Sequence, residues 1–417
     1  MPGGTRFPVP PPITGGPVAC VVAGRVPGVG MWRGDRGSAR RRGDRVTGLV
    51  PYICVSCGLS HEPAPDRWRC DCGGLLELPA GVPSWAPVHG DHGMWRYASS
   101  IAGGDELPWR RVSLGEGGTP LVGLAPDLLA KLEYVSPTGS FKDRGAVVLM
   151  SLALALGASR VVADSSGNAG TAVAAYAARA GLPAEIFVPA GTSEKKLGQI
   201  QGHGARVIVV PGSREDTALA AAERVRQGGV FYGSHVHNPY FHEGVKTYAL
   251  ELFEQLGGAA PATLVLPAGN GTLVLGAHRG FTELRAAGLI DRVPRIVAVQ
   301  AERCAPVAAA FAAGRDHVDP LRSGERRPTV AEGIAIAAPA RGDRTLRAVR
   351  DSAGTVVTVS EDEIARAHRA LARQGLWVEP TGAVSYAAAE RLRATGSPYT
   401  TGVVVVPLCG TGLKAAL

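Results

Sequence analysis

Short apolar segments alternate with longer alanine-rich segments along most of the chain, from about residue 81 to the end. The apolar segments have the composition of strands buried on both faces; they cover residues 160–164, 184–188, 206–210, 230–232, 262–266, 295–300, 355–359 and 403–406. The alanine-rich segments are long enough for helices; they cover residues 169–180, 218–226, 243–256, 272–287, 361–374 and 382–393. This alternation predicts an α/β fold in which helices cover both faces of parallel sheets.

Loops that lead from strands into helix N-termini are where such a fold binds its ligands. The loop 136–145 reads SPTGSFKDRG, in which Ser140 and Asp143 resemble a capping box that places Lys142 in a first helical turn. The apolar run that follows, 146–158, is too short to cross a membrane and suits a buried helix. The chain has only six lysines beside 38 arginines, and a helix N-terminus favours the neutral, nucleophilic amine. From position alone, a nucleophilic lysine and an exposed lysine in a helix cap fit equally well.

Two further loops lie between an apolar strand and a helix, at 164–171 (DSSGNAGT) and 267–273 (PAGNGTL). In the former, free backbone N–H groups and the hydroxyls of Ser165, Ser166 and Thr171 predict a socket for a carboxylate. In the latter, two glycines allow the backbone to approach a phosphate closely. Each loop alone is weak evidence, because any strand-to-helix turn can contain glycine. Together with the isolated lysine, they indicate an amino acid and a phosphorylated aldehyde cofactor.

Four of the seven cysteines fall close together, at Cys54, Cys57, Cys70 and Cys72. Two short-spaced pairs on opposing turns are typical of a ribbon that holds one zinc ion with four thiolates. The second pair is one residue closer than usual. Disulfides would require an export signal, and none is visible. We therefore predict a small zinc ribbon over residues 51–80, with a structural metal ion.

Composition separates the first fifty residues from the rest of the chain. The net charge is +8, and eight arginines against two aspartates give residues 1–50 a charge of +6, which leaves a nearly neutral body. Eleven glycines and seven prolines in this segment prevent regular structure. We interpret the segment as a solvated tail, or as sequence that precedes a working start at Met31. A nucleic-acid-binding arm is less favoured, because no aromatic or fold context supports it. Because prolines interrupt any signal peptide, we expect a cytoplasmic protein.

Six motifs occur in the order that threonine synthases and other fold-type II pyridoxal-phosphate enzymes show, namely SPTGSFKDRG, SSGNAG, HNPYFHEGVKT, LPAGNGT, WVEPTGA and PLCGTGLK. The cysteine ribbon before them resembles the threonine synthase branch. The chain is thus similar to this family over about residues 51–417. The resemblance implies two three-layer parallel-sheet domains preceded by the ribbon. It also implies a smaller subdomain over roughly 146–240 within the catalytic region 81–417, and a homodimer.

The resemblance also implies roles for individual residues. Lys142 would bind pyridoxal 5′-phosphate covalently and then move protons on the substrate, and Asn168 would lie beside the pyridine hydroxyl. The cofactor phosphate would be held by Gly269, Asn270, Gly271, Thr272 and Leu273. The substrate carboxylate would be bound by Ser165, Ser166, Gly167, Asn168 and Thr171.

The chain departs from the family pattern near its C-terminal end. Threonine synthases place threonine where this chain has Cys409, and Thr411 follows two residues later. A thiol is a weak hydrogen-bonding group, so either Cys409 or Thr411 would face the ring nitrogen. Cys409 fits equally well as a small buried apolar residue.

A second departure concerns the substrate. Threonine synthase acts on phosphohomoserine and needs cations around the substrate phosphate. The two arginines of the family pattern are replaced by Phe241 and Ala335. Cations that could replace them are His235, His237, His242 and Lys246, of which the last two fit equally well on a solvated helix face.

Three functional hypotheses follow. The first is a threonine synthase-like lyase that converts O-phosphohomoserine to threonine and phosphate. The second is a pyridoxal-phosphate enzyme that catalyses β-elimination or β-replacement on serine or threonine, which the missing arginines favour. The third is a non-enzymatic zinc-ribbon protein that binds nucleic acid, against which Lys142, Asn168 and the glycine loops argue. We therefore predict an enzyme of amino-acid metabolism that acts on a small amino acid, without a nucleic-acid or membrane partner.

Overall fold

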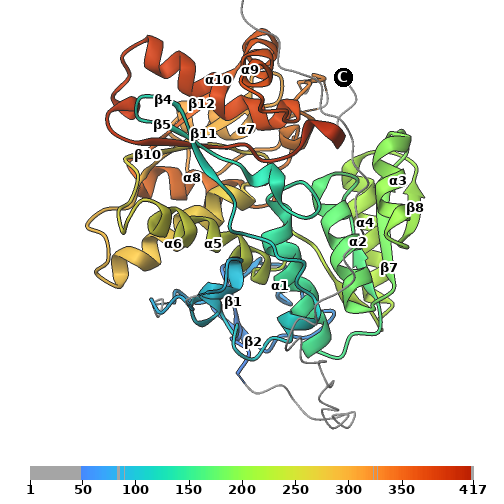
Figure 1. Ribbon diagram of the computed structural model, residues 1–417. Helices are drawn as coiled ribbons and strands as arrows, with labels where there is room; N and C mark the ends of the chain where they lie inside the picture. Colours follow the sequence, from blue (N-terminus) through green and yellow to red (C-terminus); the bar gives the residue numbers. More distant parts are fainter. Residues whose placement is uncertain (1–47, 82–84, 89, 323, 326, 415–417) are drawn as a thin grey trace, which may run out of the picture. The chain divides into compact units, whose positions relative to one another are not determined.

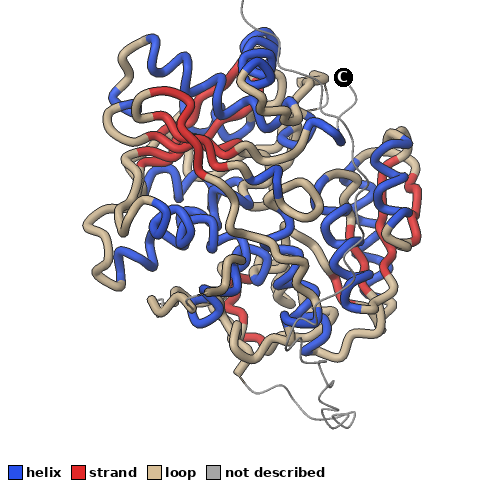
Figure 2. The backbone as a smooth tube through the Cα atoms, in the orientation of Figure 1, coloured by secondary structure: helices blue, strands red, loops and turns tan. Residues whose placement is uncertain are grey.

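The computed structural model describes residues 48–81, 85–88, 90–322, 324–325 and 327–414 (Figure 1). Within these ranges the strands form three sheets of three, six and four strands (Figure 2). The tail predicted for residues 1–50 lies outside the described residues, except for 48–50. Among the described helices, none combines the length and the apolar character needed to cross a membrane.

The six-stranded sheet contains β4 (Leu121–Ala125), β5 (Leu128–Lys131), β10 (Thr263–Pro267), β11 (Arg295–Ala301), β12 (Thr355–Val359) and β13 (Val404–Pro407). The strand order is β12-β11-β10-β13-β5-β4, and all pairs are parallel except the β4–β5 hairpin. Helices α9 (Glu361–Arg373) and α10 (Pro380–Ala394) cover one face, where Val265 and Val297 pack against them. Leu264 and Ile296 point to the opposite face, which is covered by α5 (Tyr240–Gln255), α6 (Thr272–Ala286) and α8 (Gly342–Asp351). Side chains thus alternate between two apolar layers, as expected of strands buried on both faces.

The four-stranded sheet has the order β8-β7-β6-β9 and is parallel throughout. Its strands are β6 (Val161–Ala163), β7 (Ala184–Pro189), β8 (Arg206–Val210) and β9 (Phe231–Tyr232). The helices that pack on it are α2 (Asn168–Ala180), α3 (Glu194–Gly202) and α4 (Arg214–Arg226). Helix α1 (Lys142–Ala155) contacts both α2 and α5 and so connects the layers of the two sheets (Figure 1). The α/β fold predicted from the alternation is confirmed, whereas the limits 146–240 of a subdomain stay a prediction.

The small sheet is the predicted cysteine ribbon. It consists of β1 (Tyr52–Cys54), β2 (Ser60–His61) and β3 (Leu76–Glu77), and both strand pairs are antiparallel. The ring of Tyr52 packs edge-on against the ring of Tyr240 on α5, with 5.9 Å between ring centroids. The N–H group of Val50 donates to the Tyr240 hydroxyl at 2.9 Å. The ribbon is therefore held against the catalytic region rather than tethered to it only by the chain.

The capping box predicted for Ser140 and Asp143 is wrong. The Ser140 hydroxyl is buried without a hydrogen-bond partner among the described residues. The Asp143 carboxylate accepts instead from the backbone N–H of Thr138 at 2.6 Å and from the hydroxyl of the same residue. The backbone of Ser140 forms a bridge with Gly410, three residues after the end of β13. The start of α1 is therefore fixed by the end of a neighbouring strand, which places Lys142 beside the main sheet.

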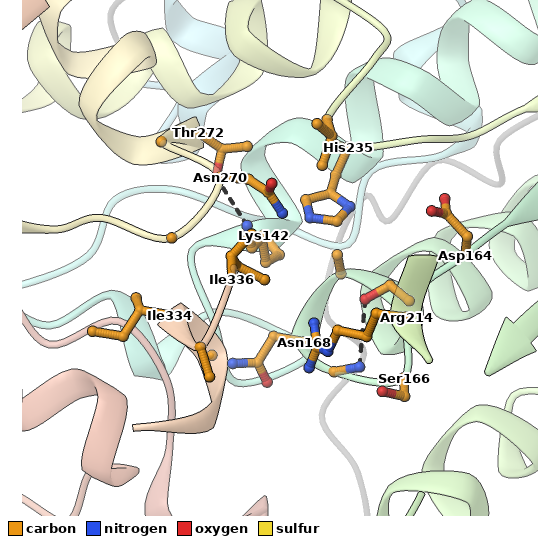
Figure 3. A pocket seen from close by; sticks show the side chains of 18 of the residues that line it. Lys142, Asp164, Ser166, Asn168, Arg214, His235, Asn270, Thr272, Ile334 and Ile336 are labelled. Atoms are coloured by element: carbon orange, nitrogen blue, oxygen red, sulfur yellow. Dashed lines mark hydrogen bonds between the residues drawn. The ribbon is translucent and has the colours of Figure 1, made fainter. Parts of the chain in front are cut away.

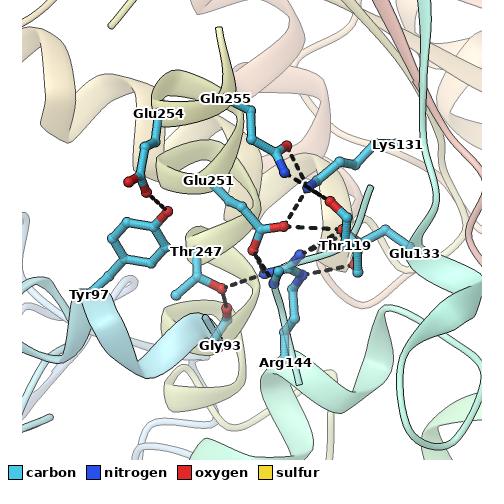
Figure 4. Close-up of polar contacts among 12 residues, drawn as sticks. Gly93, Tyr97, Thr119, Lys131, Glu133, Arg144, Thr247, Glu251, Glu254 and Gln255 are labelled. Carbon is cyan, nitrogen blue, oxygen red and sulfur yellow. Dashed lines mark hydrogen bonds and ion pairs between the residues drawn. The ribbon is translucent and has the colours of Figure 1, made fainter. Parts of the chain in front are cut away.

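Four buried charges cross-link β5, α1 and α5 behind the start of α1 (Figure 4). Arg144 donates to both carboxylate oxygens of Glu133 at 2.8 Å and to Glu251 at 3.0 Å. Lys131 pairs with Glu251 and donates to the backbone oxygen of Thr119. Two cations balance two anions, and such pairing is what buried charges require. The network holds the first turn of α1 in place.

Candidate active site

One pocket collects the loops that follow the strands of the two larger sheets (Figure 3). Its walls include the loops after β6 and β10, the start of α1, residues 235–237, and residues between 333 and 340. This is where parallel sheets place ligands, because helix N-termini meet at the carboxyl ends of strands. The predicted site residues that line it are Lys142, Ser165, Ser166, Gly167, Asn168, Gly269, Asn270, Gly271, Thr272, Leu273 and Cys409. Thr171 and Thr411 do not line it; Thr171 is buried within α2.

Lys142 is the first residue of α1 and lies half-buried at the pocket wall. Its Nζ atom donates a hydrogen bond to the Thr272 hydroxyl at 2.9 Å. The same atom lies 4.5 Å from the centre of the Phe141 ring and 5.6 Å from that of Phe241. Burial lowers the pKa of Lys142 to about 8, because removal from water disfavours the charged amine. The site thus holds a lysine whose neutral form is accessible near neutral pH.

The loop after β10 forms a backbone cradle for an anion. Gly271 caps α6 with φ of +78°, a left-handed conformation that favours glycine. A Cβ atom at Gly271 would lie 1.9 Å from the Thr345 hydroxyl, and one at Gly269 would lie 3.1 Å from the Cα atom of Ile334. The first turn of α6 also presents N–H groups without intrahelical acceptors. The cradle therefore suits a phosphate group, and Thr272 at its edge is the residue that Lys142 contacts.

The loop after β6 ends in Asn168, the first residue of α2. The amide nitrogen of Asn168 donates to both carboxylate oxygens of Glu379 at 3.0 Å, and its oxygen accepts from Lys414 at 3.3 Å. Burial raises the pKa of Glu379, although the Asn168 hydrogen bonds oppose this shift. The side-chain orientation of Asn168 is therefore fixed by two charged neighbours. Sequence reasoning missed Glu379, even though it lies in the WVEPTGA motif, directly before the proline that starts α10.

Cys409 and Thr411 are the two residues predicted to face the ring nitrogen of the cofactor. The pocket includes Cys409 and leaves out Thr411. Cys409 is fully buried, and burial raises the pKa of its thiol well above the usual range. Thr411 lies outside the pocket lining, where its backbone N–H donates to Gly139 at 3.0 Å. The group available at this wall is thus a neutral thiol.

Arg214 is a pocket residue that sequence reasoning missed. It is the first residue of α4, and its side chain extends toward the loop after β6 (Figure 3). Its position before a predicted helix was the only signal in the sequence. His235 lines the same pocket, and its pKa is well below the usual range because of burial and the charges of Lys142 and Arg214. His235 therefore acts as a neutral hydrogen-bonding group, and Arg214 as the cation.

Of the other candidate cations, His237 lines the pocket, but burial lowers its pKa to about 3, so the ring is neutral there. His242 and Lys246 are buried on α5 and do not line the pocket, so the solvated alternative for them is wrong. Lys246 pairs with Glu283 at 2.9 Å. Phe241, which replaces one family arginine, is fully buried behind Lys142. Ala335, which replaces the other, does line the pocket.

The four cysteines of the ribbon meet in one cluster, with all sulfur atoms within 4.8 Å of one another. The Cys54–Cys72, Cys57–Cys70 and Cys57–Cys72 sulfur distances are 3.5 Å, far longer than the ~2.05 Å of a disulfide. Four thiolates around zinc, with Zn–S bonds of about 2.3 Å, lie about 3.8 Å apart. The cluster therefore fits a zinc ribbon, and the ion would have a structural role because no ligand position stays open.

Comparison with known proteins places this site in a family. The family profile described as pyridoxal-phosphate dependent enzyme matches residues 112–410. The threonine synthase of Methanocaldococcus jannaschii is 33% identical over 379 residues, which are 87% of this chain and 92% of the relative. The threonine synthase of Methanosarcina acetivorans is 34% identical over 361 residues, 81% and 86% of the two chains. Among solved structures, maize serine racemase superposes with a TM-score of 0.60 and 25% identity, over 70% of this chain and 88% of that chain.

Proposed function

Because the chain belongs to the family of pyridoxal-phosphate-dependent enzymes, we propose that it is a lyase of the threonine synthase type. It would convert O-phosphohomoserine and water into threonine and phosphate. The observation that carries the proposal is one pocket that holds a lysine of lowered pKa, a phosphate cradle and an additional arginine. A homodimer that acts on a small amino acid is part of the same proposal.

The residues fit the cofactor. Pyridoxal phosphate carries an aldehyde and a phosphate on one ring, so its site needs an amine and an anion cradle close together. Lys142 meets the cradle through its 2.9 Å hydrogen bond with Thr272. Asn168 would lie beside the ring hydroxyl, and the neutral Cys409 thiol would face the ring nitrogen. When bound, the cofactor supplies an electron sink that stabilises negative charge on substrate carbon atoms.

The chain's own residues supply binding and proton transfer. The N–H groups at the start of α2, with Ser165 and Ser166, would bind the substrate carboxylate. Lys142 would move protons at the substrate carbons, since burial lowers its pKa to about 8 and makes it an effective base near neutral pH. The rings of Phe141 and Phe241 give its amine apolar neighbours, with ring centres 4.5 and 5.6 Å away.

Arg214 supports a phosphorylated substrate. Phe241 and Ala335 provide no charge where the family pattern has arginine. Arg214 enters the same pocket from α4, and its planar guanidinium can bind a phosphate through two hydrogen bonds. His235 beside it adds a neutral donor.

The second candidate is β-elimination on serine or threonine, which yields a 2-oxo acid and ammonia. The loss of arginine at Phe241 and Ala335 favours it, because an unphosphorylated substrate needs no cation there.

Purified enzyme incubated separately with O-phosphohomoserine, serine and threonine tests the two candidates. Release of phosphate and threonine from O-phosphohomoserine alone supports the proposal. Release of 2-oxo acid and ammonia from serine or threonine, with no turnover of O-phosphohomoserine, overturns it.

The contribution of Arg214 has its own test. We predict that Arg214→Gln raises the KM for O-phosphohomoserine by roughly 10- to 150-fold, since a hydrogen bond to a charged group contributes about 1.5–3 kcal/mol. Steady-state kinetics measure the change. Arg226→Gln, at the exposed opposite end of α4, is the matched control and should leave the KM unchanged. An unchanged KM in Arg214→Gln would assign the substrate phosphate to other residues.

A further inference from the structure

Arg341 is a buried arginine that connects the cysteine ribbon with the pocket wall. Its side chain has no exposed surface. Arg341 lies far from the ribbon in sequence but contacts it in the fold. On the ribbon side it pairs with the Glu77 carboxylate and donates to the backbone oxygen of Leu76 at 3.0 Å. On the pocket side it donates to the backbone oxygen of Val236 and, at 3.0 Å, to that of His237. A single guanidinium thus satisfies acceptors on two separate parts of the fold.

The ribbon residues that Arg341 contacts depend on the cysteine cluster. Leu76 and Glu77 form β3, and Leu76 lies opposite Cys54 in the β1–β3 register. The backbone N–H of Cys70 donates to Gly74 at 3.0 Å, in the turn that leads into β3. Strand pairing alone holds β3 weakly, because the sheet is short. The metal-binding turns would therefore fix the position of β3.

The pocket residues that Arg341 contacts lie beside the catalytic lysine. Residues 235–237 line the pocket, and we call this segment the histidine wall. The backbone oxygen of Arg341 also accepts from the Thr345 hydroxyl at 3.0 Å, and Thr345 is the residue against which Gly271 of the phosphate cradle packs. Arg341 therefore contacts the histidine wall directly and the phosphate cradle through one residue.

A second contact joins the ribbon to the same wall. The ring of Trp68, between the two cysteine pairs, packs edge-on against His237 with centroids 4.9 Å apart, and against Tyr232 at 5.4 Å. Tyr232 in turn donates from its hydroxyl to Asp164, a pocket residue, at 3.0 Å. The backbone N–H of Tyr232 donates to Pro65 at 3.1 Å. Two independent sets of contacts thus run from the ribbon to one side of the pocket.

We propose that the metal-loaded ribbon braces the active site, with Arg341 and Trp68 as positioning residues that hold residues 235–237 against the pocket. If the ribbon loosens, the buried guanidinium loses its Glu77 partner and one carbonyl acceptor, and a buried charge without partners is costly. The wall then shifts to find new partners. These contacts would hold the pocket in the same way whichever amino acid it binds.

Hydrogen–deuterium exchange of the holoenzyme tests the brace without any substrate. The amide hydrogens of His237 and Asn238 are bonded to Ser234, so their exchange reports the order of the wall. Removal of zinc with a chelator should speed their exchange on the order of 10- to 100-fold, as expected when hydrogen bonds to a charged group are lost. The visible circular dichroism of bound pyridoxal phosphate should change at the same time. Unchanged exchange and dichroism after complete zinc removal would overturn the proposal.

Variants separate bracing from general stability. Glu77→Gln and Trp68→Leu each remove one contact while the metal ligands stay, and each should change the exchange of the wall and the cofactor dichroism with zinc still bound. Glu62→Gln, an exposed ribbon residue, is the control and should change neither. Arg341→Met should have the largest effect, and if it does not fold, the first two variants decide. Wild-type exchange in both of them would contradict the proposal even if the enzyme proves to be a threonine synthase.

Discussion

Lys142 is the residue whose surroundings decide the chemistry of the pocket. Burial lowers its pKa to about 8, against 10.5 for an ordinary lysine. We therefore predict that the rate at which the apoenzyme captures pyridoxal phosphate rises with pH and levels off above about pH 8, because the neutral amine is the reactive form. Visible absorbance after mixing, measured over a pH series, gives the midpoint. A midpoint near 10.5 would mean that the amine stays hydrated.

Removal of the same side chain gives the most direct test of its role. In Lys142→Ala we expect no covalently bound cofactor, no characteristic yellow absorbance after dialysis, and turnover reduced by several orders of magnitude. Lys195→Ala changes an exposed lysine on α3 and should retain both cofactor and turnover. If borohydride-reduced and denatured Lys142→Ala protein still carries near-ultraviolet pyridoxyl absorbance, the cofactor is linked to another lysine.

Single residues were predictable from the sequence where one loop contains the whole signal. Lys142, Asn168 and the Gly269–Leu273 cradle each lie within a short motif, and the structure brings them to one pocket. Arg214 and Glu379 lie in separate segments, and only the packing of α4 and α10 carries them to the same place. No local pattern contains that information.

At the scale of elements, the turn before α6 is the part of the cradle most sensitive to a side chain. We predict that Gly271→Ala weakens the affinity for pyridoxal phosphate and destabilises the fold. The left-handed conformation at φ +78° costs an alanine roughly 1–2 kcal/mol, and its Cβ atom would lie 1.9 Å from the Thr345 hydroxyl. Equilibrium titration of the apoenzyme and urea unfolding measure the two effects.

The partner of this contact provides the control for the Gly271 prediction. Thr345→Ala removes the clashing hydroxyl, so the double variant Gly271→Ala/Thr345→Ala should recover part of the affinity but keep the backbone cost. If Gly271→Ala alone binds the cofactor as tightly as the wild type, the turn can move away from Thr345, and the prediction is contradicted.

Elements with one strong pattern were predictable, and elements that depend on their neighbours were not. The eight apolar segments all form strands; the inner ones, such as β10 and β11, are buried on both faces, whereas β8 and β12 lie at sheet edges and are more exposed. The β4–β5 hairpin was missed because Pro126 interrupts its apolar run and Lys131 adds a charge at its end. Lys131 is nevertheless buried, because it forms an ion pair with Glu251. Helix α8 was missed because its arginine-rich sequence lacks the alanine content that marked the others. The capping box failed because the backbone of Ser140 pairs with a distant strand end.

At the scale of the whole molecule, the resemblance to threonine synthases predicted the family, the fold and the cofactor, and the comparisons confirm all three. Net charge was a poor guide, because six of the eight excess positive charges lie in residues 1–50. The charges that organise the fold are instead buried pairs that nearly cancel. Sequence composition could not reveal them, since several join residues more than a hundred positions apart, such as Arg144 and Glu251 or Lys131 and Glu251.

The network around Arg144 can test whether buried ion pairs stabilise the fold. Arg144→Met would leave Glu133 without its arginine and Glu251 with Lys131 alone, and removing one partner of a buried pair costs about 3–5 kcal/mol. Urea unfolding at neutral pH should show this loss, whereas Arg179→Met, near the end of α2, should change stability by less than about 0.5 kcal/mol. A loss below about 1 kcal/mol in Arg144→Met would show that packing, not charge pairing, holds α1.

The same network makes the stability of the fold depend on pH in the acid range. Although burial raises the pKa of Glu251, Arg144 and Lys131 lower it to about 2. A carboxylate with a depressed pKa stabilises the fold at neutral pH, and that contribution is lost as pH falls from about 4.5 toward 2. In Arg144→Met the pKa of Glu251 should rise, so the variant should lose less stability than the wild type over this interval. Unfolding free energies measured between pH 5 and pH 3 distinguish the two curves, and parallel curves would exclude Glu251 as the source of the acid sensitivity.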